Sequence, residues 1–182
     1  MGITLYEPAP MLANERERER AVEASGALAL RSDPALQAIV EDLRRGFGTA
    51  MAAVSIVHSD WQYLIAAAGL PEGPYGRRTS FCGHALENPH QVFCVPDAEA
   101  DARFAGNPVV VEGSGLRFYA AAPLIDADHL TLGTVCVFDP RPRPGFDQAG
   151  ACRLTRAAAD VMAVIEARAD AARQTRISVA AN

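Results

Sequence analysis

The side chains best suited to chemistry gather between residues 80 and 98, in the stretch SFCGHALENPHQVFCVPDA. Cys82 stands two residues before His84, Cys94 follows twelve residues after Cys82, and Asp97 comes near the end of the stretch. A thiol with an imidazole could act as an activated nucleophile, and thiols with an imidazole and a carboxylate could hold a metal ion. The competing interpretation is that the cysteines belong to an ordinary core.

A short helix is expected to carry Cys82 and His84, since Thr79 or Ser80 can cap its start and Asn88-Pro89 can end it. Helical residues two apart point to different sides, so Cys82 and His84 should not form a nucleophile and base pair directly. The spacing matches no known set of metal ligands. We therefore predict Cys82 in a core or pocket wall, with no catalytic residue and no metal site.

The remaining cysteines give no redox or zinc signature. None of the four cysteines forms a CxxC pair. Cys94 and Cys136 fall in expected strands and Cys152 in an expected amphipathic helix, so packing is predicted for all three. The chain contains no lysine, which excludes Schiff-base chemistry.

Charged residues follow in the loop PDAEADARF, which precedes Ala105. Asp97 can cap its turn and Asp101 can pair with Arg103, so local fixing competes with ligand contact at this loop. Phe104 ends the loop and is an apolar candidate for the same site.

Arg117 and Tyr119 should project from one face of a strand on which Ala121 comes next. A guanidinium and a phenol above a small side chain would suit a small polar or anionic ligand. The alternative is an Arg117 paired with Asp101 or Asp97 and a Tyr119 in the core. The complete candidate ligand site comprises Cys82, His84, Asp97, Asp101, Arg103, Phe104, Arg117 and Tyr119.

Five runs are expected to form the sheet that positions these residues. β-Branched and aromatic runs at 53–58 and 62–69 are joined by Ser59-Asp60, as in a hairpin. Further strands are predicted at 91–95, 116–125 and 130–138. In the last strand Leu132, Cys136 and Phe138 should face one way, and Val135 and Val137 the other. Hairpin connections indicate a mainly antiparallel sheet with helices packed on its faces, an α+β fold.

Helices are predicted at both ends of the chain. Residues 14–30 should start at an Asn14 cap, with the ERERER run as a solvated face. A second helix should begin at Ser32-Asp33-Pro34 and end at Gly46 and Gly48. A long third helix from Asp147 should bury a stripe of Leu154, Ala158, Val161 and Ile165, and continue, exposed, beyond Arg168. The expected boundaries are an N-terminal helical segment at 1–30, one domain at 31–176 and a loose tail at 177–182.

Composition limits the function classes. The chain has 182 residues and a formal net charge of -5, which fits one globular domain and argues against a broad nucleic-acid surface. No apolar run approaches the roughly 20 residues of a membrane span, and no secretory signal is present. We therefore expect a cytoplasmic location, no nucleic acid and no membrane association.

Several strings are together similar to those of GAF domains, especially the input domains of bacterial histidine kinases and cyclic-dinucleotide enzymes. They are RRTSFCGHAL, VFCVPDAEADARFAGNPVV, GLRFYAAAPL and LGTVCVFDPRPR. The resemblance covers roughly residues 15–168. It implies about six mainly antiparallel strands, terminal helices stacked on one face, and a ligand pocket on the other face closed by segments around 81–115. It also implies homodimerisation through the terminal helices.

The resemblance also bears on cofactors and activity. Bilin-binding members attach pigment through a cysteine commonly followed by His or Tyr, whereas Gly83, Val95, Val137 and Arg153 follow the cysteines here. A bilin is therefore not expected, and the cofactor stays unidentified. Cyclic-nucleotide-binding members carry an Asn-Lys-Phe-Asp-Glu signature, which a chain without lysine cannot contain.

Three functions remain open. The leading hypothesis is a non-catalytic sensor that binds an unidentified small molecule and acts on a histidine kinase or cyclic-dinucleotide output module. The second is a free methionine-R-sulfoxide reductase, whose Val-Cys-Gly-Thr-Ala string resembles Phe81-Cys82-Gly83-His84-Ala85. That family's essential cysteine, however, would fall where this chain has Asn107-Pro108-Val109-Val110. The third is a dimerisation module with no ligand.

Overall fold

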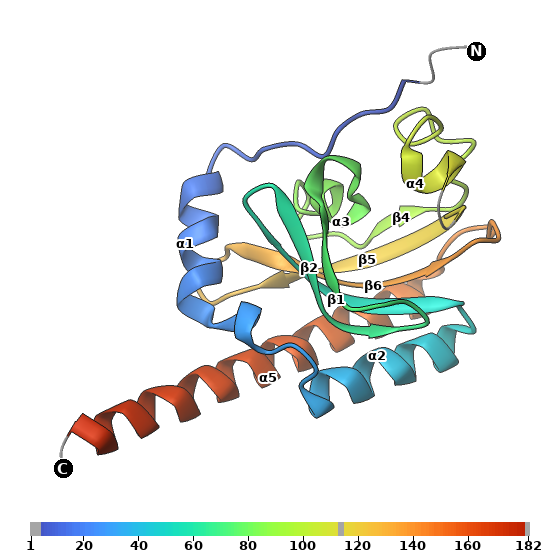
Figure 1. The fold of residues 1–182 in the computed structure, drawn as a ribbon. Coiled ribbons are helices and arrows are strands. Elements are labelled where there is room, and N and C mark those ends of the chain that lie inside the picture. Colours follow the sequence, from blue (N-terminus) through green and yellow to red (C-terminus); the bar gives the residue numbers. More distant parts are fainter. Residues whose placement is uncertain (1–4, 113–114, 181–182) are drawn as a thin grey trace.

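The computed structural model describes residues 5–112 and 115–180 (Figure 1). Six strands form one sheet in the order β3-β2-β1-β6-β5-β4, and the pairings that join them are antiparallel. Helices cover both faces, which confirms the predicted α+β architecture. The strands are β1 (Met51–His58), β2 (Trp61–Ala68), β3 (Gly73–Gly76), β4 (Phe93–Val95), β5 (Phe118–Ile125) and β6 (Thr131–Asp139).

Short runs of apolar, β-branched and aromatic residues located five of these strands. They missed β3, because the sequence GPYG has no apolar alternation and contains a proline, which is tolerated here on an edge strand. One predicted facing was also wrong. Leu132 packs on the same side as Val135 and Val137. The pairing of β5 with β6 shifts register there, because Leu124 pairs with Gly133 and Ile125 pairs with Thr131, which leaves Leu132 as an extra residue in β6. The bulge inverts the side-chain alternation beyond it.

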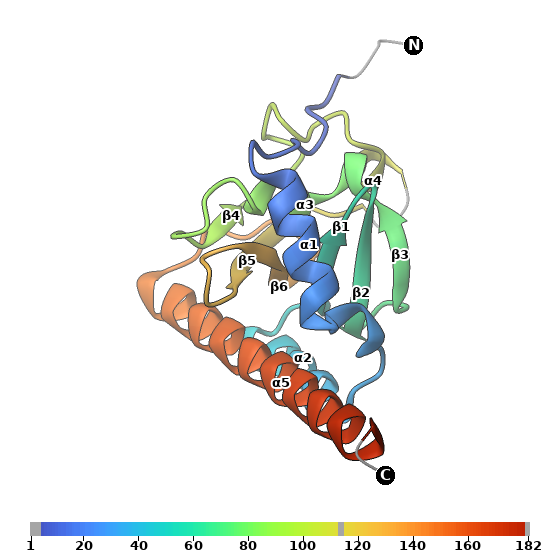
Figure 2. The same ribbon diagram turned by 90° about the vertical axis from the view of Figure 1, so that its left-hand side faces the viewer.

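The longest helices pack on one face of the sheet (Figures 1 and 2). They are α2 (Pro34–Phe47), capped by Asp33 Oδ1, which accepts from the amide of Ala35 at 2.9 Å, and α5 (Gln148–Ala180). The predicted stripe of α5 is buried in the core that they share with the sheet. Residues 177–180 continue α5, so the expected loose tail is helical there, and residues 181–182 lie outside the described ranges.

Helix α1 (Glu15–Ser25) is shorter than predicted. It ends at Gly26, whose φ of 68° is left-handed, and a 3₁₀ helix, η1 (Ala27–Ala29), follows. Asn14 holds the N-cap position, but its side chain accepts no capping hydrogen bond. None of the described helices combines the length and hydrophobicity that a bilayer-spanning segment requires.

The ERERER run was predicted to be a solvated helix face. This prediction is wrong for two of its residues, which are buried. Arg18 is 0% exposed and Glu15 is 7% exposed. Glu15 Oε1 accepts from Arg18 Nε at 3.0 Å and from Arg77 Nη1 at 2.6 Å. Arg18 Nη1 also donates to the carbonyl of Val57 at 2.5 Å and to that of Thr131 at 3.4 Å. We call Glu15, Arg18 and Arg77 the buried ion cluster.

Short segments cover the opposite face of the sheet: the 3₁₀ helix η2 (Arg77–Thr79), α3 (Phe81–Ala85) and α4 (Pro108–Val111). The N-terminal segment 5–12 runs beside α3 (Figure 1). Its Glu7 amide donates to the Arg103 carbonyl at 2.9 Å. A Cβ on Gly83 would lie 2.6 Å from the Cβ of Ala9, so a side chain there would displace the segment.

Candidate ligand-binding site

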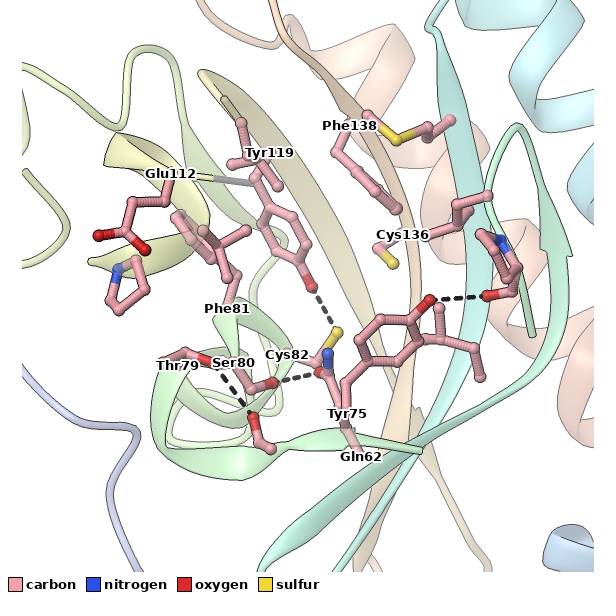
Figure 3. Close-up of a pocket in the computed structure, with 18 residues that line it drawn as sticks. Gln62, Tyr75, Thr79, Ser80, Phe81, Cys82, Glu112, Tyr119, Cys136 and Phe138 are labelled. Atoms are coloured by element: carbon pink, nitrogen blue, oxygen red, sulfur yellow. Dashed lines mark hydrogen bonds between the residues drawn. The ribbon is translucent and has the colours of Figure 1, made fainter. Parts of the chain in front are cut away.

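A cavity of about 530 Å³ lies between the sheet and the segments η2, α3 and α4 (Figure 3). Its walls are mainly apolar, and exposed residues such as Pro71, Tyr75 and Glu112 lie at its edge. The lining residues are Met51, Gln62, Leu64, Leu70, Pro71, Tyr75, Gly76, Thr79, Ser80, Phe81, Cys82, Pro108, Val109, Glu112, Leu116, Tyr119, Cys136 and Phe138.

Polar groups occupy a few fixed places on this wall. The Ser80 hydroxyl bonds to Gln62 Oε1 and also caps α3 by accepting from the Gly83 amide at 3.0 Å. The Tyr75 hydroxyl donates to the Pro71 carbonyl at 2.9 Å. Among the lining residues that the structure describes, Glu112 is the one Asp, Glu, Lys or Arg, and the lowered pKa of Cys82 favours a second negative charge there. The cavity therefore favours a neutral or cationic molecule over an anion.

Two of the predicted site residues meet in this cavity. The Tyr119 hydroxyl donates to Cys82 Sγ at 3.1 Å, and both side chains are buried (Figure 3). The nearby Cys136 thiol, with smaller contributions from Thr134 and Tyr119, lowers the pKa of Cys82 to about 6 against the effect of burial. Burial and the two neighbouring thiols raise the pKa of Tyr119 well above its usual value. The predicted position of Cys82, in a core or pocket wall, agrees with its burial beside the cavity.

Arg117 does not line the cavity with Tyr119. It pairs with Asp97 while Tyr119 is buried, which is the alternative that the sequence left open. Strand β5 begins only at Phe118, so Arg117 precedes it. Arg117 Nε donates to Asp97 Oδ1 at 2.7 Å, and Arg117 Nη2 donates to Asp97 Oδ2 at 2.8 Å. Its Nη1 also lies 2.8 Å from Glu99 Oε2. This bidentate pair lowers the pKa of Asp97. Arg117 and Asp97 therefore form an ion pair, and neither residue lines the cavity.

The other four candidates form a cluster behind the cavity wall. The Arg103 guanidinium bonds to both oxygens of Asp101 and lies 5.1 Å from the ring centroid of Phe104. Phe104 stacks on Phe81 with centroids 4.0 Å apart. His84 Nε2 lies 3.0 Å from the Glu7 carbonyl, and burial lowers the pKa of the imidazole. None of the four lines the cavity. Phe104 instead packs against Phe81 and His84, which both belong to α3.

Sequence reasoning missed several cavity residues. Gln62, Ser80 and Glu112 carried no signal, because membership depends on how distant segments fold together. Cys136 was predicted to pack in the core, and it is buried, yet it also lines the cavity. Cys152 was predicted to pack but is exposed, because it lies beside the buried stripe of α5 and not on it.

Comparisons with known proteins agree with this architecture. The model of the GAF domain family matches residues 32–165. A cyclic di-GMP phosphodiesterase from Pseudomonas aeruginosa is 36% identical over 156 residues, which are 86% of this chain and 26% of that protein. The chain thus spans about a quarter of that relative's length.

Two solved structures share the fold at low sequence identity. The GAF domain of PixJ from Thermosynechococcus elongatus, in its blue-light absorbing form, has a TM-score of 0.62 and 14% identity, with 95% of this chain and 99% of that chain covered. The free methionine-R-sulfoxide reductase from Neisseria meningitidis, in complex with its substrate, has a TM-score of 0.57 and 20% identity, with 96% and 99% covered.

Proposed function

This chain belongs to the GAF domain family, and from that premise we propose that it is a non-catalytic cytoplasmic sensor. It binds a small molecule in the cavity and signals through its terminal helices within a homodimer. The observation that carries the proposal is the cavity itself, whose volume of about 530 Å³ lies in the range of small-molecule sites. Apolar walls supply affinity, and the few polar groups orient the molecule.

The buried ion cluster offers a route from the cavity to α1. Gly76, Thr79 and Ser80 line the cavity on either side of Arg77. Arg77 Nη2 donates to Glu15 Oε2 at 2.9 Å, and Glu15 holds Arg18. A molecule that displaces η2 would therefore change the position of the first turn of α1. A signal by this route requires different ligand affinity in two positions of the helix.

Helix α5 supports the proposed homodimer. It extends past the sheet and past α2, so its last turns have no neighbour in the described chain (Figure 1). Ile177 and Val179 near its end are 70% and 72% exposed. Large apolar side chains on a protruding helix favour contact with the same helix of a second copy. The output module would be a histidine kinase or a cyclic-dinucleotide enzyme.

A neutral fluorescent probe, N-phenyl-1-naphthylamine, tests the cavity. Saturable binding with one probe per chain is expected for the wild type. Val109→Trp fills the cavity and should abolish binding. Val111→Trp is the matched control, because Val111 lies in the same helix, is 51% exposed and does not line the cavity. Equal binding by both variants would refute the assignment.

Two other functions predict different results. A dimerisation module without a ligand predicts no saturable probe binding by any variant. A free methionine-R-sulfoxide reductase predicts turnover of methionine sulfoxide that Cys82→Ala abolishes. The sensor predicts no such turnover, whereas probe binding is retained in Cys82→Ala because the other walls of the cavity remain.

A further inference from the structure

Two thiols and a phenol meet on one wall of the cavity. Cys82 comes from α3, while Cys136 and Tyr119 come from the adjacent strands β6 and β5. In Figure 3 the Tyr119 hydroxyl is directed at the Cys82 sulfur, and the Cys136 side chain lies on the same side of the cavity. The Cys136 thiol donates to the Ala53 carbonyl at 3.5 Å. Cys82 and Cys136 are 4% and 1% exposed, so the cavity that both line is their route to small reagents.

Unpartnered hydroxyls beside the thiols provide a second, independent observation. Ser55 and Thr134 face each other across β1 and β6, and both side chains are 0% exposed. Neither hydroxyl oxygen has a hydrogen bond of ordinary geometry within the described chain. Such orphans are rare and costly in a buried site. Both hydroxyls are near enough to Cys82 to favour its ionised form, so they are donors available to a thiolate.

We propose that Cys82 and Cys136 are a redox-active dithiol, which a small hydroperoxide entering the cavity oxidises to a disulfide. Cys82 is the attacking thiol and Cys136 the resolving thiol. Tyr119 positions Cys82 through its 3.1 Å hydrogen bond. The lowered pKa of Cys82 and the raised pKa of Cys136 agree with this division of roles.

The oxidation balances in two steps. The Cys82 thiolate attacks an oxygen of the hydroperoxide, the O–O bond breaks, and the departing alkoxide takes a proton to leave as an alcohol. Cys82 is then a sulfenic acid, oxidised by two electrons. Cys136 loses its proton and attacks the Cys82 sulfur, the S–O bond breaks, and the hydroxide leaves as water. One hydroperoxide thus yields one disulfide, one alcohol and one water.

The disulfide would alter the cavity wall. It would join α3 directly to β6 and remove the thiol that accepts the hydrogen bond of Tyr119. The proposal needs only the cavity and its thiols, so it stands whether or not the cavity also binds the small molecule proposed above. A failed probe titration and a failed oxidation are therefore separate results.

The exposed Cys152 provides an internal competitor. Reduced full-length protein is treated with hydrogen peroxide or cumene hydroperoxide, quenched with iodoacetamide and mapped by peptide mass spectrometry. The expected first product is a bond between Cys82 and Cys136, although Cys152 is far more accessible. The lowered pKa of Cys82 favours its thiolate, so the buried Cys82 should be oxidised before the exposed Cys152.

Variants separate the two roles. Cys136→Ser should stop the reaction at a Cys82 sulfenic acid, which dimedone traps, and Cys152→Ser should leave the disulfide yield unchanged. Cys136→Ala repeats the test without a hydroxyl, and circular dichroism confirms that each variant folds. Oxidation of Cys152 before Cys82 would overturn the proposal, as would a wild-type Cys82 sulfenic acid that never bonds to Cys136.

Discussion

Replacing Glu15 by Gln should destabilise the fold far more than its place in a charge-rich helix suggests. Burial opposes ionisation of Glu15, yet hydrogen bonds from Arg77, Arg18 and the Leu12 amide lower its pKa from 4.5 to about 2. Each tenfold change in proton affinity corresponds to about 1.4 kcal/mol, so this lowering corresponds to about 3 kcal/mol of folding stability. Losses of 3–5 kcal/mol are typical when one partner of a buried pair is removed.

The pH dependence follows from the lowered pKa. The stabilisation is complete above pH 4.5, the ordinary pKa, and is lost as the pH falls through about 2, where the folded protein binds the proton. Urea unfolding at pH 7 should therefore separate wild type from Glu15→Gln by about 3 kcal/mol. The difference should shrink as the pH is lowered below 4.5.

Glu17→Gln is the matched control, because Glu17 lies in the same first turn of α1 and is exposed. It should change the unfolding free energy by less than about 0.5 kcal/mol. Equal losses in the two variants would refute the burial of the ion cluster. A Glu15→Gln deficit that stays constant between pH 7 and the acid limit of the folded protein would refute its electrostatic origin.

Other predictions concern caps, close packing and the cluster behind the cavity. Asp33→Ala should cost about 1 kcal/mol in urea unfolding, because it removes the cap of α2, and Asp33→Asn should restore most of it. Gly133→Ala should cost about 2 kcal/mol or more, since a Cβ would lie 1.9 Å from the Ser55 carbonyl oxygen; an unchanged Tm would contradict this. Arg103→Lys should lower the free energy of unfolding by about 1 kcal/mol, because lysine cannot stack on Phe104 and bind both oxygens of Asp101 as the guanidinium does. Arg78→Lys, at an exposed position, should leave the free energy of unfolding unchanged.

The sequence predicted the elements whose local pattern matches their environment. β-Branched and aromatic runs joined by Ser59-Asp60 located the two-stranded hairpin of β1 and β2, and the cap at Asp33 located the start of α2. Strand β3 has no such pattern and is held as a strand by pairing with β2. Burial of Arg18 was also invisible, because its partners include carbonyls at Val57 and Thr131, far away in the chain.

The candidate site was predicted in part. The usual burial of free cysteines predicted Cys82 in a core or pocket wall, and strand alternation placed Tyr119 with Ala121 on one face. Local pattern could not decide whether Arg117 faced a ligand or a carboxylate 20 residues away, and the structure pairs it with Asp97. The convergence of Cys136 with Cys82 depends on how α3 lies over β6, which no local signal encodes.

Native mass spectrometry of the chain isolated from cells tests the central claim most directly, since it reads subunit number and retained small molecules together. We predict a dimer that carries a small-molecule mass, which dissociates on denaturation and is missing from Val109→Trp but present in Val111→Trp. The same unliganded mass for the wild type and both variants would contradict the claim that this cavity is a sensor's binding site.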